Sequence, residues 1–271
     1  MKTVLITGAC GGIGKTTALY FANKGWSVIA TMLCLEEKKE FEPYDNIHCF
    51  ALDVTSTASI ETCKNDILLQ FPKIDTIINN AGVGYRSFVE LACDNEIERI
   101  VEINWLGVVK VCRAFIPVFR EQKFGQFINI TSIAGLVNLP LGSFYHSTKH
   151  AVESFSECMA YELLDFNISV TTVQFGNTPS NFQKNVVKST TTSITAYANL
   201  MRKIDEVLAQ KTKKNVDLKQ SIVEELLQIA ENPSKNFKRH TIGFDANFLH
   251  IARKRLGYQM FARMIRRSVF K

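Results

Sequence analysis

The sequence predicts an α/β fold in which a doubly wound parallel sheet lies between two layers of helices. Short apolar runs alternate with helical patterns over roughly the first 180 residues. The runs are apolar throughout, which is typical of parallel strands that helices cover on both faces. The chain has 271 residues, 46% hydrophobic and 21% charged, so we expect a single domain over residues 1–271.

The expected strands begin near the amino terminus. They are Thr3–Ile6, Ser27–Thr31, Ile47–Leu52, Thr76–Asn79, Gln126–Thr131 and Ile168–Gln174. Parallel strands need crossover connections, and the helical patterns between the runs can supply them. Ligands of such sheets bind beyond the carboxyl ends of the strands. Residues that follow the six runs are therefore candidates for a binding site.

Residues 181–235 differ in composition from the alternating part before them. They contain a serine and threonine run at 189–193, clusters of lysine, and a helical pattern with apolar residues at Leu218, Ile222, Leu226 and Ala230. We interpret this segment as a helical lid over the active edge of the sheet. Additional packing on the sheet is the alternative, and the sequence leaves it open.

The cysteine and charge patterns exclude several classes of protein. Seven cysteines show neither CxxC nor Cys/His spacing, so we expect reduced thiols and no metal site. The apolar run at the amino terminus is too short for a signal sequence, and no run is long enough to span a bilayer, which favours the cytoplasm. The net charge of +6 arises in residues 236–271, a basic C-terminal segment with nine lysines and arginines against Asp245.

A glycine turn joins the first expected strand to the first helix in the stretch VLITGACGGIGKTTALYFA. Gly8, Gly12 and Gly14 would let the backbone approach a pyrophosphate closely, and the free amides at the start of the helix favour that anion. We therefore expect a dinucleotide at this end of the chain. A tight turn without a ligand is the alternative.

An apolar stripe predicts one buried helical face, in which Asn104 is the single polar member. The stripe comprises Ile97, Val101, Asn104, Val108, Val111, Phe115 and Val118. A buried amide costs about 1–3 kcal/mol unless it is hydrogen-bonded. Asn104 therefore requires a partner, which can be backbone, water or a lysine.

The stretch SFYHSTKHA places Tyr145 and Lys149 four residues apart at the start of another helical pattern. Residues at this spacing share one face of a helix, so the ammonium group can act on the phenol. Free tyrosine has a pKa of about 10, and a phenolate at neutral pH needs about 4 kcal/mol of stabilisation, to which a nearby cation contributes. His146 and His150 face other sides of the helix, so we expect packing or surface roles for them.

These motifs together resemble the short-chain dehydrogenase/reductase family over roughly residues 1–182. Thr7-Gly8-x-x-x-Gly12-x-Gly14 resembles its cofactor loop, Asn79-Asn80-Ala81-Gly82 its motif after the fourth strand, and Tyr145-x-x-x-Lys149 its catalytic pair. The resemblance implies a Rossmann fold and an NAD(P)(H)-dependent oxidoreductase. Within the family, the sequence looks most similar to the branch of 17β-hydroxysteroid and retinol dehydrogenases.

The resemblance also implies roles for individual residues. Tyr145 would be the acid/base, and Ser132 would steady the substrate oxygen. Lys149 would hold the nicotinamide ribose and, together with the positive nicotinamide of an oxidised cofactor, would lower the pKa of Tyr145. Asn104 would complete the proton path through a water molecule. The expected cofactor-binding residues are Gly8, Cys10, Gly12, Ile13, Gly14, Met32, Asp53, Val54, Asn80, Ala81, Gly82, Tyr145, Lys149, Gly176, Thr178 and Ser180.

Two positions depart from the family pattern. Met32 stands near the place where an acidic residue would bind the adenosine ribose and favour NAD, so we expect NADP in preference to NAD. No arginine follows for the 2′-phosphate, and Lys15 or Lys38 would have to replace it. After the sixth strand the chain reads FGNTPS in place of Pro-Gly and a threonine. Ser180, or Thr178 if the loop is shorter, would supply that hydroxyl to the carboxamide.

An apolar stretch at residues 133–142 favours a hydrophobic substrate. The resemblance to the 17β-hydroxysteroid and retinol dehydrogenase branch implies an alcohol or carbonyl compound of the steroid, retinoid or long-chain type. The stretch would line the site with Val83, Phe88 and Phe182 opposite, and ordinary packing is the alternative. In the basic C-terminal segment, a helical face of Phe261, Met264, Ile265 and Val269 permits docking on the core or contact with an anionic membrane surface.

Other functions compete with this interpretation. A dinucleotide-binding sensor without turnover would not need the set of Asn104, Ser132, Tyr145 and Lys149. A sugar-nucleotide epimerase shares the tyrosine and lysine but uses a TGxxGxxG loop, which this chain does not match. We expect no nucleic-acid partner, because no recognition module is present. By analogy with the family we expect a homo-oligomer formed through the helices that contain Asn104 and Tyr145.

Overall fold

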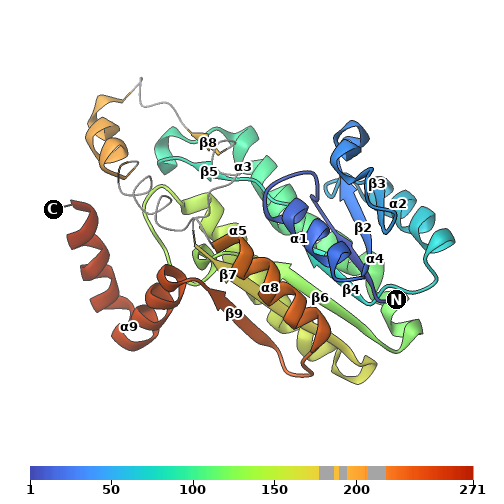
Figure 1. Ribbon diagram of the computed structural model, residues 1–271. Coiled ribbons are helices and arrows are strands. Elements are labelled where there is room, and N and C mark those ends of the chain that lie inside the picture. Colours follow the sequence, from blue (N-terminus) through green and yellow to red (C-terminus); the bar gives the residue numbers. More distant parts are fainter. Residues whose placement is uncertain (177–185, 189–193, 205, 207–217, 271) are drawn as a thin grey trace.

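A seven-stranded parallel sheet forms the centre of the part of the chain that the computed structural model describes, residues 1–176, 186–188, 194–204, 206 and 218–270 (Figure 1). Its strand order is β3-β2-β1-β4-β6-β7-β9, so the order reverses beside β1. The strands are β1 (Thr3–Ile6), β2 (Ser27–Met32), β3 (Ile47–Ala51), β4 (Thr76–Asn79), β6 (Gly125–Ile130), β7 (Ile168–Phe175) and β9 (Lys238–Ile242). A separate parallel pair consists of β5 (Tyr85–Arg86) and β8 (Val187–Lys188).

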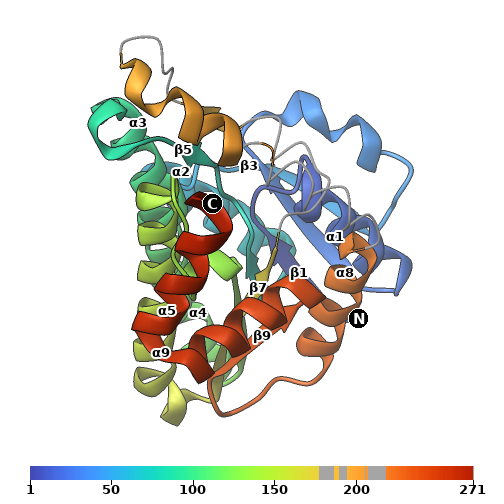
Figure 2. The ribbon, with the colours of Figure 1, turned by 90° about the vertical axis from the view of Figure 1, so that its left-hand side faces the viewer.

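Helices cover both faces of the sheet, which gives the expected three layers (Figure 2). One face carries α1 (Gly12–Asn23) and α8 (Leu218–Glu231), and the other carries α2 (Thr57–Gln70), α4 (Gly107–Gln122) and α5 (Ser143–Glu162). The chain also forms α3 (Asp94–Val101) and α9 (Phe244–Phe270). The short turns of helix are η1 (Leu35–Phe41), η2 (Val89–Leu91), η3 (Glu102–Leu106), η4 (Ile133–Gly135), η5 (Leu164–Phe166) and η6 (Thr195–Tyr197).

The doubly wound fold is confirmed, and each of the six expected strands is present within one residue at either end. Their side chains are buried between two apolar layers, because helices pack on both faces. The sequence analysis missed β9. This strand lies at the sheet edge and begins with exposed Lys238 and Arg239, so its sequence KRHTI has no apolar run.

Helix α8 was expected to belong to the lid, and for this helix the expectation is wrong. Ile222, Val223 and Leu226 are fully buried, and the helix packs beside α1 in one of the two apolar layers. It is the crossover between the parallel strands β7 and β9, so its apolar face covers the sheet. Residues 177–185, 189–193, 205 and 207–217 lie outside the described residues, so a lid within 181–217 stays a prediction.

The buried stripe around Asn104 is interrupted by a π-helical segment. Residues Glu102–Leu106 form this segment, η3, between α3 and α4. A π turn inserts an extra residue into the helix and changes which residues face inward. Ile100 is therefore buried before the segment, where the stripe predicted Val101. At the far end of α4, Phe119 is buried, where the stripe predicted Val118.

Helix α9 docks on the core. Docking was one of the two interpretations of the basic C-terminal segment. The helix breaks at Gly257, whose φ is 66° (Figure 1). Phe261 is buried and joins Ile133, Val137 and Ala246 in an apolar cluster, against which Met264 and Ile265 also pack. The side chain of Val269 lies outside the described part of the chain.

Replacement of Leu226 by alanine tests the position of α8. The change leaves a cavity between α8 and the sheet, so we expect the free energy of unfolding to fall by about 2–5 kcal/mol in urea denaturation. Gln228→Ala, on the exposed side of the same helix, should change it by less than about 0.5 kcal/mol. Equal, small effects of the two variants would show that α8 is a detached lid.

Candidate active site

The functional motifs meet at one edge of the sheet. Since the strands are parallel, the loops that follow β1, β4, β6 and β7 leave the sheet on the same side. They begin at Thr7, Asn80, Thr131 and Gly176. The glycine turn, the Asn-Ala-Gly motif and Ser132 are therefore neighbours in space, as expected.

The three motif glycines of the turn serve two different purposes. Gly8 and Gly12 have φ values of 64° and 56°, which side chains of L-residues rarely permit. Gly14 allows a close approach, because a Cβ there would lie 2.4 Å from the carbonyl oxygen of Gly8. Asn80 Nδ2 stabilises this packing by donating to the carbonyl oxygens of Thr7 and Gly8, each at 3.0 Å.

The start of α1 is suited to an anion. Its first residues are Gly12, Ile13 and Gly14, whose backbone amides have no partner within the helix. The Ile13 side chain is buried in the core, so its amide rather than its side chain faces the loop. Free amides and the positive end of a helix favour a pyrophosphate at this position.

The motif after β4 connects this turn to the residues expected to be catalytic. Thr7 Oγ1 accepts hydrogen bonds from the amides of Asn80 and Ala81, both at 3.0 Å. Gly82 follows, and a Cβ at that position would lie 3.3 Å from Asn104 Oδ1 and 3.7 Å from Lys149 Nζ. An added Cβ would therefore crowd the Asn104 amide and lie in ordinary contact with the Lys149 ammonium group.

The residues expected around the adenosine contribute in different ways. The Met32 side chain is buried in the core, so it does not face the expected position of the ribose. Only the place of Met32 at the end of β2 matches the expectation. Cys10 is exposed in the glycine turn, where partial burial and a hydrogen bond with Glu37 raise the pKa of the thiol to about 11. Lys15, a candidate for the 2′-phosphate, is ion-paired with Glu40.

The loop after β3 is ordered by its own side chains. Asp53 Oδ1 accepts from the amide and the hydroxyl of Thr55, at 2.9 and 2.7 Å. Val54 is buried beside Gly107 of α4, where a Cβ would lie 2.9 Å from Val54 Cγ2. These contacts hold Asp53 at the edge of the sheet.

Asn104 finds its partner in the backbone. It is fully buried within η3, its Oδ1 accepts from the amide of Val83 at 2.8 Å, and its Nδ2 donates to the carbonyl of Val83 at 2.9 Å. A longer contact of 3.4 Å reaches Thr148 Oγ1. This pair of hydrogen bonds ties the π-helical segment to the loop after Gly82.

Tyr145, Lys149 and Ser132 come together where α5 crosses the end of β6. The Ser132 side chain hydrogen-bonds Tyr145, and its Oγ also accepts from the amide of Ala134 at 3.1 Å. Lys149 Nζ donates to the carbonyl oxygen of Ile130 at 3.0 Å and lies 5.9 Å from the centre of the Tyr145 ring. The four expected catalytic residues are thus assembled in one site.

Burial shifts the pKa values of both Tyr145 and Lys149 in the polypeptide. Burial raises the pKa of Tyr145 to about 12, against the opposing effects of the Ser132 hydrogen bond and the charge of Arg86. Lys149 is 5% exposed, and burial lowers its pKa to about 8, while the charge of Glu153 acts in the opposite direction. In the polypeptide by itself, burial therefore outweighs the effects that lower the tyrosine pKa. The expectation combined the charge of Lys149 with that of an oxidised nicotinamide, so a tyrosine pKa near neutrality in the complex stays a prediction.

Three charged residues of the site were missed in the sequence analysis: Arg86, Glu153 and Arg239. Glu153 shares the face of α5 that carries Tyr145 and Lys149, and it is 4% exposed. Glu153 could have been found from the sequence as a charged residue on the same helical face as Tyr145 and Lys149. Arg86 and Arg239 could not be found in this way, since tertiary contacts alone bring β5 and β9 to the site.

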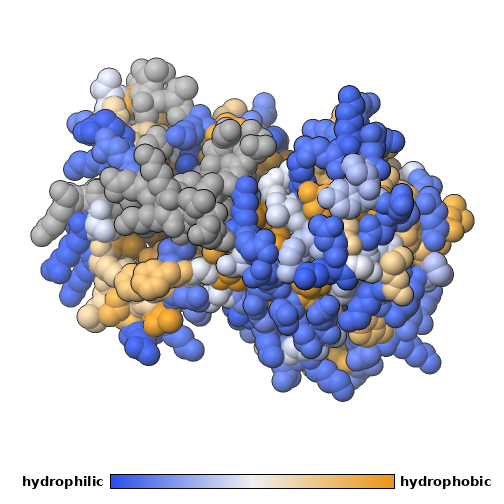
Figure 3. All heavy atoms as spheres, viewed as in Figure 1, coloured by the Kyte–Doolittle hydropathy of each residue, from blue (hydrophilic) through white to orange (hydrophobic). Residues whose placement is uncertain are grey.

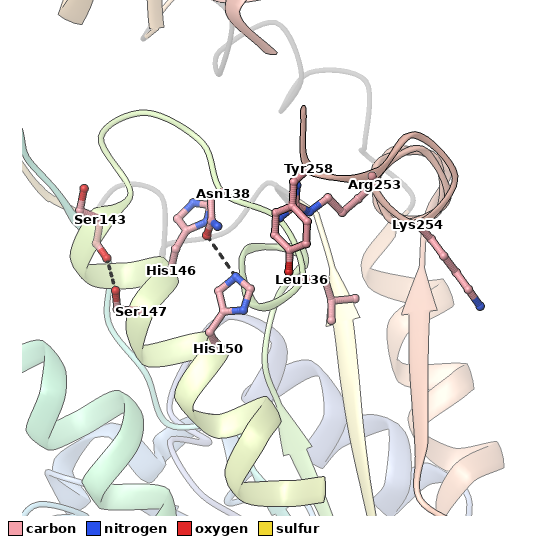
Figure 4. A pocket seen from close by; sticks show the side chains of 10 residues that line it. Leu136, Asn138, Ser143, His146, Ser147, His150, Arg253, Lys254 and Tyr258 are labelled. Carbon is pink, nitrogen blue, oxygen red and sulfur yellow. Dashed lines mark hydrogen bonds between the residues drawn. The ribbon is translucent and has the colours of Figure 1, made fainter. Parts of the chain in front are cut away.

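The two histidines have the structural roles that were expected. His146 Nδ1 hydrogen-bonds the carbonyl of Val137 at 2.7 Å, and burial lowers its pKa to about 4. His150 Nε2 lies 3.1 Å from Asn138 Oδ1. Both line a cavity of about 690 Å³ between α5 and α9, together with Arg253 and Tyr258 (Figure 4).

The loop after β7 contributes Gly176 to the described site. A Cβ on Gly176 would lie 2.2 Å from Asp245 Oδ2, so the start of α9 packs directly against this glycine. Thr178 and Ser180, expected at the carboxamide, and Phe182, expected in the substrate site, lie among residues 177–185, outside the described ranges.

Gly14→Ala tests the packing of the glycine turn. The added Cβ would collide with the carbonyl of Gly8, so we expect the free energy of unfolding to fall by about 1–3 kcal/mol. Gly11→Ala is the matched control, because Gly11 is extended and nothing lies within 4 Å of a Cβ there. Chemical denaturation of both variants is the measurement, and equal losses would contradict this account of the turn.

Comparison with known proteins agrees with this geometry. The sequence profile of the short chain dehydrogenases matches residues 2–191. The 3-ketodihydrosphingosine reductase of Bacteroides thetaiotaomicron is 36% identical over 184 residues, which are 68% of this chain and 66% of that protein. An uncharacterised oxidoreductase of Schizosaccharomyces pombe is 31% identical over 79% of this chain and 94% of its own length.

Two further relatives extend the comparison. Retinol dehydrogenase 8 of Bos taurus is 29% identical over 71% of this chain and 64% of its own length. A short-chain dehydrogenase from Streptomyces avermitilis, 27% identical, superposes with a TM-score of 0.81 and covers 94% of this chain and 93% of the other. The alignments thus span slightly less than two thirds of the Bacteroides and Bos proteins. The chain belongs to the short-chain dehydrogenase/reductase family of oxidoreductases, and retinol dehydrogenase is among its relatives.

Proposed function

We propose that the protein transfers hydride between a nicotinamide dinucleotide and a hydrophobic alcohol or carbonyl compound. The observation that carries this proposal is the convergence of Tyr145, Ser132 and Lys149 at one sheet edge, beside the glycine turn. A binding protein without turnover has no need of such a set, and no specific observation favours that alternative.

The residues at this edge fit the cofactor. Gly8, Gly12 and Gly14 place no side chain of their own in front of the amides of α1, and Gly82 keeps the space beside Asn104 and Lys149 open. The pyrophosphate would bind at that turn, and Lys149 would hold the nicotinamide ribose. The cofactor supplies the hydride chemistry when bound.

Tyr145 is the proposed proton donor in carbonyl reduction. Its pKa of about 12 keeps the phenol protonated at neutral pH, and Ser132, hydrogen-bonded to it, can donate to the same substrate oxygen. Lys149 carries the positive charge that stabilises the tyrosine oxygen as the proton leaves. Asn104 holds the loop after Gly82 against η3, and a water bound there would connect the proton path to solvent.

We propose NADP(H) in preference to NAD(H), because Met32 offers no carboxylate to the adenosine ribose. Lys15 and Lys38 are the candidate cations for a 2′-phosphate, and Glu40 competes for Lys15. Separate titrations with NADPH and NADH test the preference, and tighter binding of NADH would reverse it.

An apolar cluster supports the proposal that the substrate is hydrophobic. Leu141, Met201 and Ile204 pack together with Phe88, which was expected in the substrate site. Ile133 and Val137, which belong to the apolar stretch 133–142, pack against α9 instead. For these two residues the alternative of ordinary packing is therefore correct. The names of three relatives contain lipid-type compounds, namely 3-ketodihydrosphingosine, retinol and fatty acyl-CoA.

Location and assembly are further parts of the proposal. Among the described residues, none of the helices is both long and apolar enough to cross a bilayer. Apolar side chains gather over α9 (Figure 3), where Phe244, Phe248 and Ile251 are exposed near arginines and lysines. The face expected at a membrane, with Phe261, Met264 and Ile265, packs on the core instead. We therefore propose a cytoplasmic protein that touches anionic membranes through the exposed Phe244, Phe248 and Ile251, which sedimentation with anionic vesicles tests. A homo-oligomer through α4 and α5 is proposed by family analogy, and light scattering tests it.

Tyr145→Phe tests the proton donor. We expect carbonyl reduction to fall by about 10²–10⁴-fold, because the variant keeps the ring but lacks the acidic proton. The measurement is absorbance at ~340 nm, the nicotinamide band, with steroid, retinoid and aliphatic ketones and aldehydes, and with NADPH and NADH separately. Dinucleotide affinity should remain unchanged in the variant. Undiminished turnover would exclude Tyr145 as the donor.

The pH dependence follows from the two shifted groups. Carbonyl reduction needs Tyr145 protonated and Lys149 charged, and Lys149 loses its proton as the pH rises through about 8. We expect kcat/KM for reduction to be level below that pH and to fall above it. A profile that stays level up to pH ~10, the pKa of an ordinary lysine, would show that the charge of Lys149 is not required.

A further inference from the structure

Glu153 is a buried carboxylate on the catalytic helix. Tyr145, Lys149 and Glu153 are spaced four residues apart along α5 and therefore lie on one face. The carboxylate is one helical turn beyond Lys149, and its residue is 4% exposed. Burial of a carboxylate is costly unless hydrogen bonds or a cation stabilise it.

Four side chains from three strands or strand ends satisfy this carboxylate. Thr172 Oγ1 donates at 3.0 Å and Gln174 Nε2 at 2.6 Å, both from β7. Arg239 Nε donates at 2.9 Å from β9, and Thr131 Oγ1 donates from the end of β6. Glu153 therefore joins α5 to three neighbouring strands of the sheet.

The contact with Thr131 lies between the two contacts that place the catalytic pair. Three successive residues at the end of β6 each bind a residue on the inner face of α5, in the pairs Ile130 with Lys149, Thr131 with Glu153, and Ser132 with Tyr145. The packing there is close, because a Cβ on Gly135 would lie 3.0 Å from Glu153 Cγ. A displacement of Glu153 would therefore displace Lys149 and Tyr145.

The charge of Glu153 also acts on Lys149, whose buried amine would otherwise favour its neutral form. The other groups around the pair come from several elements. Arg86 of β5 acts on Tyr145, Arg239 of β9 pairs with Glu153, and His150 of α5 and His250 of α9 also feel the Glu153 charge. Glu157 of α5 shares Arg239, whose Nη2 lies 2.6 Å from Glu157 Oε2.

We propose that Glu153, anchored by Arg239, is a positioning residue that keeps Lys149 an ammonium ion and holds the catalytic face of α5 in register with the end of β6. The inference rests on the proposed roles of Tyr145 and Lys149. It adds a charged pair that the catalytic motif does not contain. Arg239 limits the effect, because its positive charge offsets part of the field of Glu153 at Lys149.

Glu153→Gln removes the charge with little change of volume, and the direct measurement is the pKa of Lys149. Lysine labelled with ¹³C at Cε gives a signal that moves as the amine titrates, and Lys149→Arg assigns the signal. We expect the pKa of Lys149 to fall by about 1 pH unit or more in Glu153→Gln. Glu157→Gln is the matched control, because it removes another partner of Arg239 but none of the contacts with β6 and β7. It should leave the pKa of Lys149 in place.

A second variant covers the case in which Glu153→Gln does not fold. Arg239→Gln leaves the charge of Glu153 without its ion-pair partner, so the pKa of Lys149 should rise. An unchanged Lys149 pKa in folded Glu153→Gln, or an unchanged or lower one in Arg239→Gln, would overturn the inference.

Kinetics provide a separate readout once a substrate is found. The alkaline fall of kcat/KM for reduction should move to lower pH in Glu153→Gln, in step with the Lys149 titration, and stay in place in Glu157→Gln. The titration needs no substrate, so it tests the inference even if the proposed function fails. Conversely, an active enzyme with an unmoved Lys149 pKa would refute the inference and leave the proposed function intact.

Discussion

The site depends on the way α5 docks against the carboxyl end of β6. Backbone and side-chain groups of Ile130, Thr131 and Ser132 bind successive turns of the helix, and this fixes where the phenol and the amine lie. The parallel sheet brings the glycine turn of β1 and the loop of β4 to the same edge. The residues proposed for dinucleotide binding and those proposed for proton transfer are adjacent for that reason, although they lie far apart in sequence.

This arrangement places charge in a poorly solvated environment. Lys149 is 5% exposed, so its ammonium form needs compensation, which Ile130 and Glu153 provide. The same burial raises the pKa of Tyr145 to about 12, which suits a proton donor in carbonyl reduction. Alcohol oxidation needs the phenolate instead, and an oxidised nicotinamide would bring an additional positive charge toward it.

Much of the fold, and the juxtaposition of Asn104, Ser132, Tyr145 and Lys149, could be predicted from the sequence, because buried parallel strands and glycine turns have local signatures. Such signatures are absent from β9, whose edge position allows Lys238 and Arg239 on the strand, so its place depends on pairing with β7. The pattern of α8 predicted a helix but not the layer that it joins. The ion pair of Glu153 could not be predicted, because its partner Arg239 lies 86 residues away in sequence.

A crystal structure with bound dinucleotide is the most direct test of the central claim, that the docking of α5 on β6 presents the Tyr145 hydroxyl to a carbonyl group beside the nicotinamide. We expect the hydroxyl to face the reactive carbon of the ring, with space for the carbonyl between them and with Lys149 at the ribose. A structure in which the hydroxyl points away from the nicotinamide, or in which no reactant fits between them, would contradict the account.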